Sequence, residues 1–113
     1  MKEINKEMLH LVAGYLQHRS NEGYYTTNSQ IQEMILINTT RVVRDADVRH
    51  IIHEIRVKDL LPCLIANCNG YKVIPQEEVL LKYEESLLSK ENSIRAVRRA
   101  MRRQRENLQP RML

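Results

Sequence analysis

Three residues in one short segment have the chemistry needed to read a base or to hold a phosphate. Arg49, His53 and Arg56 follow one another at intervals of four and three residues, which places them on one face of a helix. The planar guanidinium of arginine matches the O6 and N7 acceptors of guanine, and both residue types can contact phosphate oxygens. An ordinary solvated helix face is the bland alternative. We predict that a helix over residues 45–58 contacts DNA through these side chains.

Four more side chains flank this helix or follow it in a hairpin pattern. Asn69-Gly70 separates two β-rich runs and predicts a tight turn, because both residues tolerate positive φ. A hairpin over residues 63–74 would then follow the helix directly. Plain turn chemistry is the alternative for the asparagines. The further DNA contacts that we predict are Arg41, Arg44, Asn67 and Lys72.

Metal binding and catalysis find little support in the sequence. His50, His53, Cys63 and Cys68 are possible zinc ligands, but the two cysteines lie at opposite ends of one predicted strand. Five residues of strand separate them by roughly 16 Å, which is too far to share a metal ion or a disulfide. There is no Gly-rich phosphate loop and no nucleophile elbow. We therefore predict no metal site, no cofactor and no enzymatic activity.

Hydrophobic periodicity predicts two helices before the contact segment. A first helix near residues 3–18 has apolar residues at three- and four-residue spacing, and residues 19–23 break that period as a loop. Thr27 stands three residues before Gln30, which is the spacing of a capping box at the start of a short second helix. Residues 24–26 would form a short strand that pairs with the later hairpin.

The third helix carries the predicted contact residues. Residues 38–40 look like a turn, and residues 41–44 either begin the helix early or extend the loop. Asp45 is the predicted N-cap, and Asp47 in the first turn suits the helix dipole. The apolar residues of this helix share a face different from that of the arginines: Val48, Ile51, Ile52 and Ile55.

From residue 76 to about residue 107 the chain contains no Gly or Pro, which predicts one helix of about 48 Å. Apolar residues recur there every seven residues. The position three residues after each of them, called the offset position here, holds Tyr83 and Val97 in two repeats but Lys90 and Gln104 in the other two. A helix that overhangs a small domain needs another surface to cover such a seam. We predict a homodimer through this helix, formed by Leu80, Leu87, Ile94 and Met101.

Charge is distributed unevenly over the 113 residues. Residues 1–75 have a net charge of +1, residues 76–94 of −3 and residues 95–113 of +6. The Arg-rich end would either bind phosphates through counterion release or pair with the acidic half of an antiparallel partner helix. An RNA-binding helix is a third possibility. Only the second interpretation explains why the two halves of the helix have opposite charges.

No apolar run approaches the ~20 residues of a membrane span. The N-terminus lacks the apolar core and small-residue cleavage site of a signal peptide. Two cysteines are also few for a small secreted chain. These features predict a cytoplasmic protein with no membrane partner.

The pattern from Tyr25 to about Arg99 resembles that of small winged-helix proteins common in bacteriophages and mobile elements. The residues that carry the resemblance are the capped segment from Thr27 to Ile31, the run from Val48 to Arg56, the run from Gly70 to Ile74, and the heptads after Pro75. The resemblance implies a mostly α fold with a small β-hairpin, namely a winged helix-turn-helix domain followed by a long C-terminal helix. In winged helix-turn-helix proteins the last helix before the wing enters the DNA major groove.

Two functions follow as predictions. The first is a double-stranded DNA-binding protein, a regulator or replication accessory of a phage or mobile element, with its winged domain in residues 1–75 and its oligomerisation helix in residues 76–113. The second is a protein-interaction module, an inhibitor or adaptor of a host complex. It would use the winged fold as a scaffold and the C-terminal helix as its binding surface.

Overall fold

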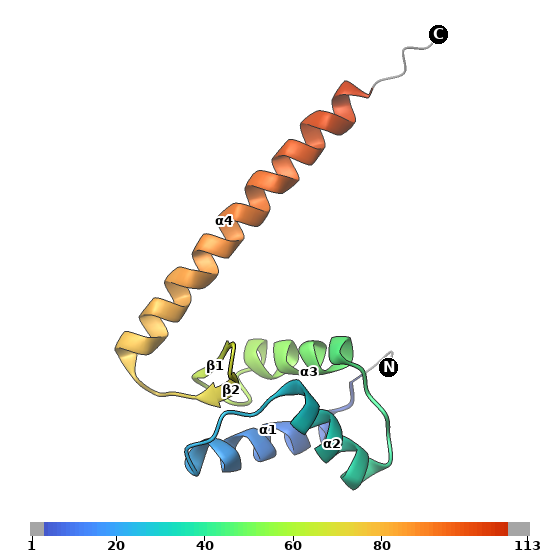
Figure 1. Ribbon diagram of the computed structural model, residues 1–113, viewed down its shortest axis with the longest axis vertical. Coiled ribbons are helices and arrows are strands. Elements are labelled where there is room, and N and C mark those ends of the chain that lie inside the picture. Colours follow the sequence, from blue (N-terminus) through green and yellow to red (C-terminus); the bar gives the residue numbers. More distant parts are fainter. Residues whose placement is uncertain (1–3, 109–113) are drawn as a thin grey trace. The chain divides into compact units, whose positions relative to one another are not determined.

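The structure is a computed structural model that describes residues 4–108. These residues form four helices and one two-stranded antiparallel hairpin, in the order α1, α2, α3, β1, β2, α4 (Figure 1). The described residues are mostly helical, and their last element is a long helix, as the sequence predicted. The described residues up to Gln76 form one compact unit, and those from Glu77 onward form another.

Helix α1 spans Lys6–Asn21 and therefore begins and ends three residues later than the predicted range. The predicted start at residue 3 lies outside the described residues. Asn5 caps the helix by accepting a hydrogen bond from the Met8 backbone N–H at 2.8 Å. The helix continues through part of the predicted loop because the chain turns only at Gly23, whose φ is +90°.

Helix α2 spans Asn28–Thr39, and its predicted capping box is confirmed. The Thr27 hydroxyl accepts from the Gln30 backbone N–H, while the Gln30 side chain accepts from the Thr27 backbone N–H. The predicted turn at residues 38–40 is wrong, because the helix extends to Thr39. The Asn38 side-chain amide donates a hydrogen bond to a carbonyl of the preceding helical turn at 2.8 Å. Asn38 therefore finds its hydrogen-bond partner within the helix. Thr40, at φ 59°, ends the helix.

Residues 41–44 form an irregular connection, which decides between the two alternatives that the sequence left open. Val43 is buried in the core, and its carbonyl accepts a hydrogen bond from the Gln32 side chain at 3.0 Å. One apolar side chain in the core and one hydrogen bond from α2 therefore hold the loop in place.

Helix α3 spans Asp45–Val57, and its N-cap is Arg44, so the prediction of Asp45 as N-cap is wrong. The reason is that Asp47, at the third helical position, accepts from the Arg44 backbone N–H at 2.9 Å. This hydrogen bond satisfies the backbone of the residue before Asp45, which shifts the cap by one position.

The hairpin consists of β1, Leu64–Asn67, and β2, Gly70–Val73. Its register pairs Asn67 with Gly70, so only Cys68 and Asn69 connect the strands. Of the two residues in the predicted Asn-Gly turn, only Gly70 has a positive φ, +117°. The turn is therefore present, but Gly70 belongs to the strand and supplies the special backbone geometry.

The predicted pairing of residues 24–26 with the hairpin is confirmed at one residue. Thr26 and Tyr71 form an isolated antiparallel bridge with two backbone hydrogen bonds, at 2.9 and 2.8 Å. Thr26 is fully buried. This bridge connects the segment between α1 and α2 to the second strand of the hairpin.

One hydrophobic core joins α1, α2, α3 and the hairpin. In Figure 1, α3 and the hairpin lie along one edge of this unit, and α1 and α2 lie along the other. The side chains that are completely buried in the core are Val12, Leu16, Ile31, Ile35, Val48, Ile51 and Ile55. All of them are aliphatic, and the chain contains no Phe or Trp.

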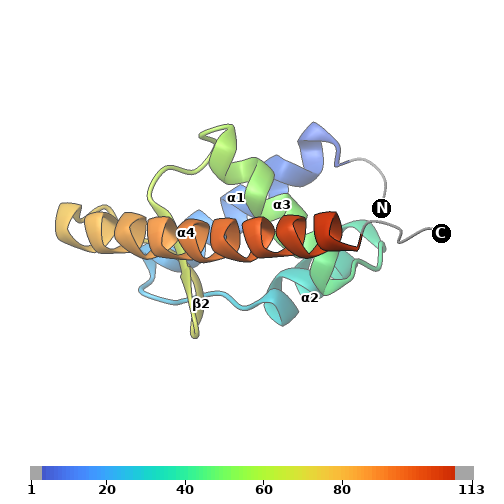
Figure 2. The same cartoon turned by 90° about the horizontal axis from the view of Figure 1, so that it is seen from above.

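Helix α4 spans Glu77–Asn107 and runs without a break (Figures 1 and 2). The sequence predicted this helix to within one residue at its start, because no Gly or Pro interrupts it. None of its residues is buried. Within residues 4–108, no helix combines the length and the apolar character needed to cross a membrane.

Candidate nucleic-acid interface

The apolar face of α3 is fully used by the core. Val48, Ile51 and Ile55 have no exposed surface, and Ile52 is also buried. Arg49 and His53 are exposed, which agrees with the face predicted from their spacing. Arg56 lies in the last turn of the helix and is half-buried. The solvent-facing group on α3 is therefore smaller than the sequence suggested.

Two acidic residues of α3 have local partners. Asp47 is buried, and the hydrogen bond from the Arg44 backbone N–H holds the pKa of its carboxyl below the ordinary value of 3.8, although burial opposes that shift. Glu54 forms an ion pair with Lys58 at 3.2 Å. These contacts offset two of the negative charges that would oppose a polyanion near Arg49.

Arg44 and Arg41 occupy different surroundings. The Arg44 Nε lies 3.5 Å from the Asp47 carboxylate, yet its side chain is 78% exposed, so it remains accessible to a phosphate at the start of α3. Arg41 instead lines a surface depression together with Asn5, Met8 and Leu11 at the beginning of α1. The structure therefore groups Arg44 with α3, whereas Arg41 is grouped with α1.

The hairpin brings Asn67 and Lys72 to one aromatic ring, that of Tyr25. The Asn67 side-chain amide donates to the Tyr25 hydroxyl at 3.3 Å, and the Lys72 ammonium lies 5.2 Å from the ring centroid. The Asn67 side-chain oxygen also accepts from the Asn69 backbone N–H at 2.8 Å. Asn67 thus builds the turn, and Lys72 remains the hairpin residue whose charge is suited to a phosphate contact.

Tyr25 and Arg19 are residues of this site that sequence reasoning missed. Arg19 donates from Nε to the Thr26 hydroxyl at 2.8 Å and from a terminal nitrogen to the Tyr25 carbonyl at 2.9 Å. Its guanidinium also lies 5.2 Å from the centroid of the Tyr24 ring. Arg19 therefore fixes the segment that supports the hairpin. The only sequence signal was the short β-rich run at residues 24–26, and it did not indicate that a residue of α1 would bind this segment.

The possible metal ligands are not assembled into a site. Between Ile4 and Leu108, no three His, Cys, Asp or Glu side chains lie close enough to hold a metal ion. Cys63 and Cys68 are both free thiols, and they lie directly before and after β1, as the argument from strand length required.

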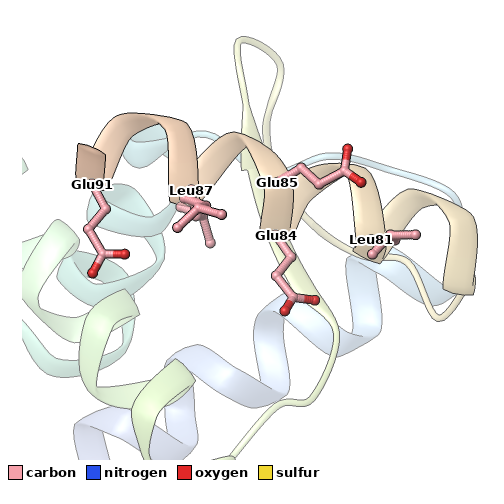
Figure 3. Close-up of a pocket in the computed structure, with 6 residues that line it drawn as sticks. Leu81, Glu84, Glu85, Leu87 and Glu91 are labelled. Atoms are coloured by element: carbon pink, nitrogen blue, oxygen red, sulfur yellow. The ribbon is translucent and has the colours of Figure 1, made fainter. Parts of the chain in front are cut away.

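The predicted oligomerisation residues lie along α4, where Leu87 is 45%, Ile94 68% and Met101 57% exposed. Leu80 is half-buried. Two further leucines are exposed beside this row, Leu81 and Leu88. Figure 3 shows a surface depression in the first half of the helix, lined by leucines and glutamates that all belong to α4: Leu81, Glu84, Glu85, Leu87, Leu88 and Glu91.

No protein-family model, curated protein or solved structure matches this chain. The winged-helix resemblance therefore rests on the residue patterns and on the order of the elements.

Proposed function

We propose that this chain binds double-stranded DNA through α3 and the hairpin, as a regulator or replication accessory of a phage or other mobile element. The observation that carries the proposal is the division of α3 into two faces. Its aliphatic face is buried, whereas Arg49 and His53 are exposed on a helix that leads directly into a hairpin bearing Lys72. A helix followed by a hairpin wing is a known way to place side chains in a major groove.

The charges near α3 support the same proposal. The carboxylates of Asp47 and Glu54 have basic partners within the chain, while Arg44 is largely exposed at the N-terminal end of the helix. Backbone N–H groups at a helix N-terminus also favour anions. This proposal places the protein in the cytoplasm of a host cell, where its DNA would be.

Selection of bound sequences from a random DNA pool, followed by titration at several salt concentrations, tests the proposal. Arg49→Ala should weaken specific binding by about 1–3 kcal/mol if Arg49 reads a base. Lys72→Ala should instead reduce the salt slope by about one unit. Lys6→Ala, which removes the same charge from α1, is the matched control and should leave the affinity nearly unchanged.

A folded wild-type protein that shifts no DNA at low salt would reject the proposal. Equal losses for Arg49→Ala and Lys6→Ala would show that any binding depends on net charge and not on α3.

Self-association through α4 is the second part of the proposal. Exposed leucines such as Leu87 and Leu88 are costly to leave in water, since burying an aliphatic side chain is worth roughly 1.5–3 kcal/mol. The same surface suits the alternative function, a protein-interaction module directed at a host complex. A protein that is monomeric, does not bind DNA at low salt, and loses its capture of a host protein on Leu87→Lys would favour that alternative.

A further inference from the structure

We propose that two copies of the chain pair through α4 in an antiparallel orientation with one fixed register, in which the helices cross at their midpoint, Asn92. The inference deepens the self-association proposed above and is independent of DNA contact. It rests on the charges at successive heptad positions of α4 and on the exposure of its apolar row.

The apolar row defines the contact face. Leu87, Ile94 and Met101 recur every seven residues, Val97 lies at the offset position, and all four are exposed. A seven-residue repeat of this kind is the pattern that a second helix covers by knobs-into-holes packing. Because α4 is continuous from Glu77 to Asn107, two full helices can overlap along their whole length.

The side chains along one flank of this face change from negative to positive charge along the helix. The residues next to the offset positions are Glu77, Glu84, Glu91, Arg98 and Arg105, so the flank is acidic in the first three heptads and basic in the last two. In an antiparallel pair, like flanks face each other. The full overlap then sets Glu84 nearly level with the partner's Arg98, and Glu77 nearly level with the partner's Arg105.

The same register also keeps the lysine that interrupts the apolar row away from its own copy in the partner. Leu87 would meet the partner's Val97, and Lys90 would meet the partner's Ile94 and not another lysine. Glu91 would approach its own copy near the axis, where the adjacent Lys90 of each chain and the ion pair between Glu91 and Arg95, at 3.8 Å, offset the repulsion.

A parallel pair has none of these advantages. It would bring Lys90 against the partner's Lys90 in the centre of the seam, and like charges without compensation oppose association. In a parallel pair, the charged flank of one helix would face the other flank of its partner. That flank contains Ser86, Ser93 and Ala100, so no pair of opposite charges would form. In the antiparallel pair these small residues face one another, and Ser93 lies close to the partner's Ser93.

Disulfide trapping of the full chain tests the orientation. In a Cys63→Ser, Cys68→Ser background, Ser93→Cys should form a cross-linked dimer on mild oxidation, because both copies of residue 93 lie beside the axis. Met101→Cys should not, since its two copies would be separated by about 27 Å at 1.5 Å per residue. Sedimentation of each reduced variant establishes whether it is dimeric before oxidation.

Every other result overturns the proposal. Efficient cross-linking of Met101→Cys but not of Ser93→Cys would show a parallel pair, and efficient cross-linking of both would exclude a single register. A dimer that cross-links at neither site pairs through another surface. A monomeric protein would reject self-association itself, whereas the DNA titrations would stand unaffected.

Charge reversal tests the register without cysteines. Glu84→Arg and Arg98→Glu should each raise the dimer dissociation constant by about tenfold, because each change turns two attractions per dimer into repulsions. The double variant should return to within about threefold of the wild-type value. Glu85→Arg with Arg99→Glu, one position along on the outer face, is the matched control and should change little. Failure of the double variant to recover would overturn the pairing of Glu84 with Arg98.

Discussion

Gly70 offers the sharpest test of the hairpin, because two separate features of the structure require glycine there. Its φ is +117°, and a Cβ atom at this position would lie 2.4 Å from the Thr26 carbonyl oxygen. Carbon and oxygen atoms that are not bonded cannot approach so closely, so Gly70→Ala must displace the Thr26 backbone. That backbone forms the two hydrogen bonds of the bridge to Tyr71.

The magnitude of the effect follows from these two features. A non-glycine residue in such a strained conformation costs about 1–3 kcal/mol. Loss of one or both bridge hydrogen bonds adds about 0.5–1.5 kcal/mol for each. We therefore expect Gly70→Ala to lower the free energy of unfolding by about 1.5–6 kcal/mol, which is at least about 6 °C in Tm for a unit of this size.

Substitutions at two other glycines separate the cost of backbone strain from the cost of the close approach to Thr26. Gly23 has a φ of +90°, but nothing lies within 4 Å of an added Cβ, so Gly23→Ala measures the backbone strain alone. Gly14 lies in the middle of α1 with open space around it, and Gly14→Ala should stabilise the chain by about 0.5–1 kcal/mol. The excess loss for Gly70→Ala over Gly23→Ala then reports the close approach to Thr26.

Urea unfolding followed by tyrosine fluorescence suits this comparison, because four of the five tyrosines precede Gln76. If Gly70→Ala loses no more stability than Gly23→Ala, the contact between the hairpin and the segment before α2 is wrong. If it unfolds at the wild-type urea concentration, the turn itself has been misplaced.

Two further predictions concern polar contacts that hold the N-terminal unit together. Arg19→Met keeps the apolar stem but removes the donors to the Thr26 hydroxyl and the Tyr25 carbonyl, so it should lower the free energy of unfolding in urea by about 2–4 kcal/mol. Arg19→Lys should recover only part of this loss. An Arg19→Met variant as stable as the wild type would contradict the role of the guanidinium. Asp47 has a lowered folded-state pKa, so its carboxylate stabilises the fold above its ordinary pKa of 3.8 and this contribution is lost as the pH falls through the lowered value. The difference in unfolding free energy between wild type and Asp47→Asn should therefore shrink between pH 5 and pH 2, and a constant difference would show that the charge is irrelevant.

Much of the architecture was determined by local sequence rules. The capping box of Thr27 and Gln30 marked the start of α2 because both partners lie within one turn of the helix. The apolar face of α3 followed from 3.6-residue periodicity, and α4 followed from a long segment without Gly or Pro. In each case the decisive interactions join residues close in sequence, so the pattern alone was sufficient.

Tertiary contacts decided the details of the candidate site. The position of Arg41 beside α1 and the support of Lys72 by Tyr25 depend on residues distant in sequence, and no periodicity encodes them. The requirement for glycine at residue 70 is also tertiary, because Thr26 approaches it from a segment more than forty residues earlier. Sequence therefore determined which helices and strands form and which of their faces are apolar. The packing of the segment before α2 against the hairpin decided which polar side chains remain available to a partner, since each buried hydrogen-bonding group first had to be satisfied within the fold.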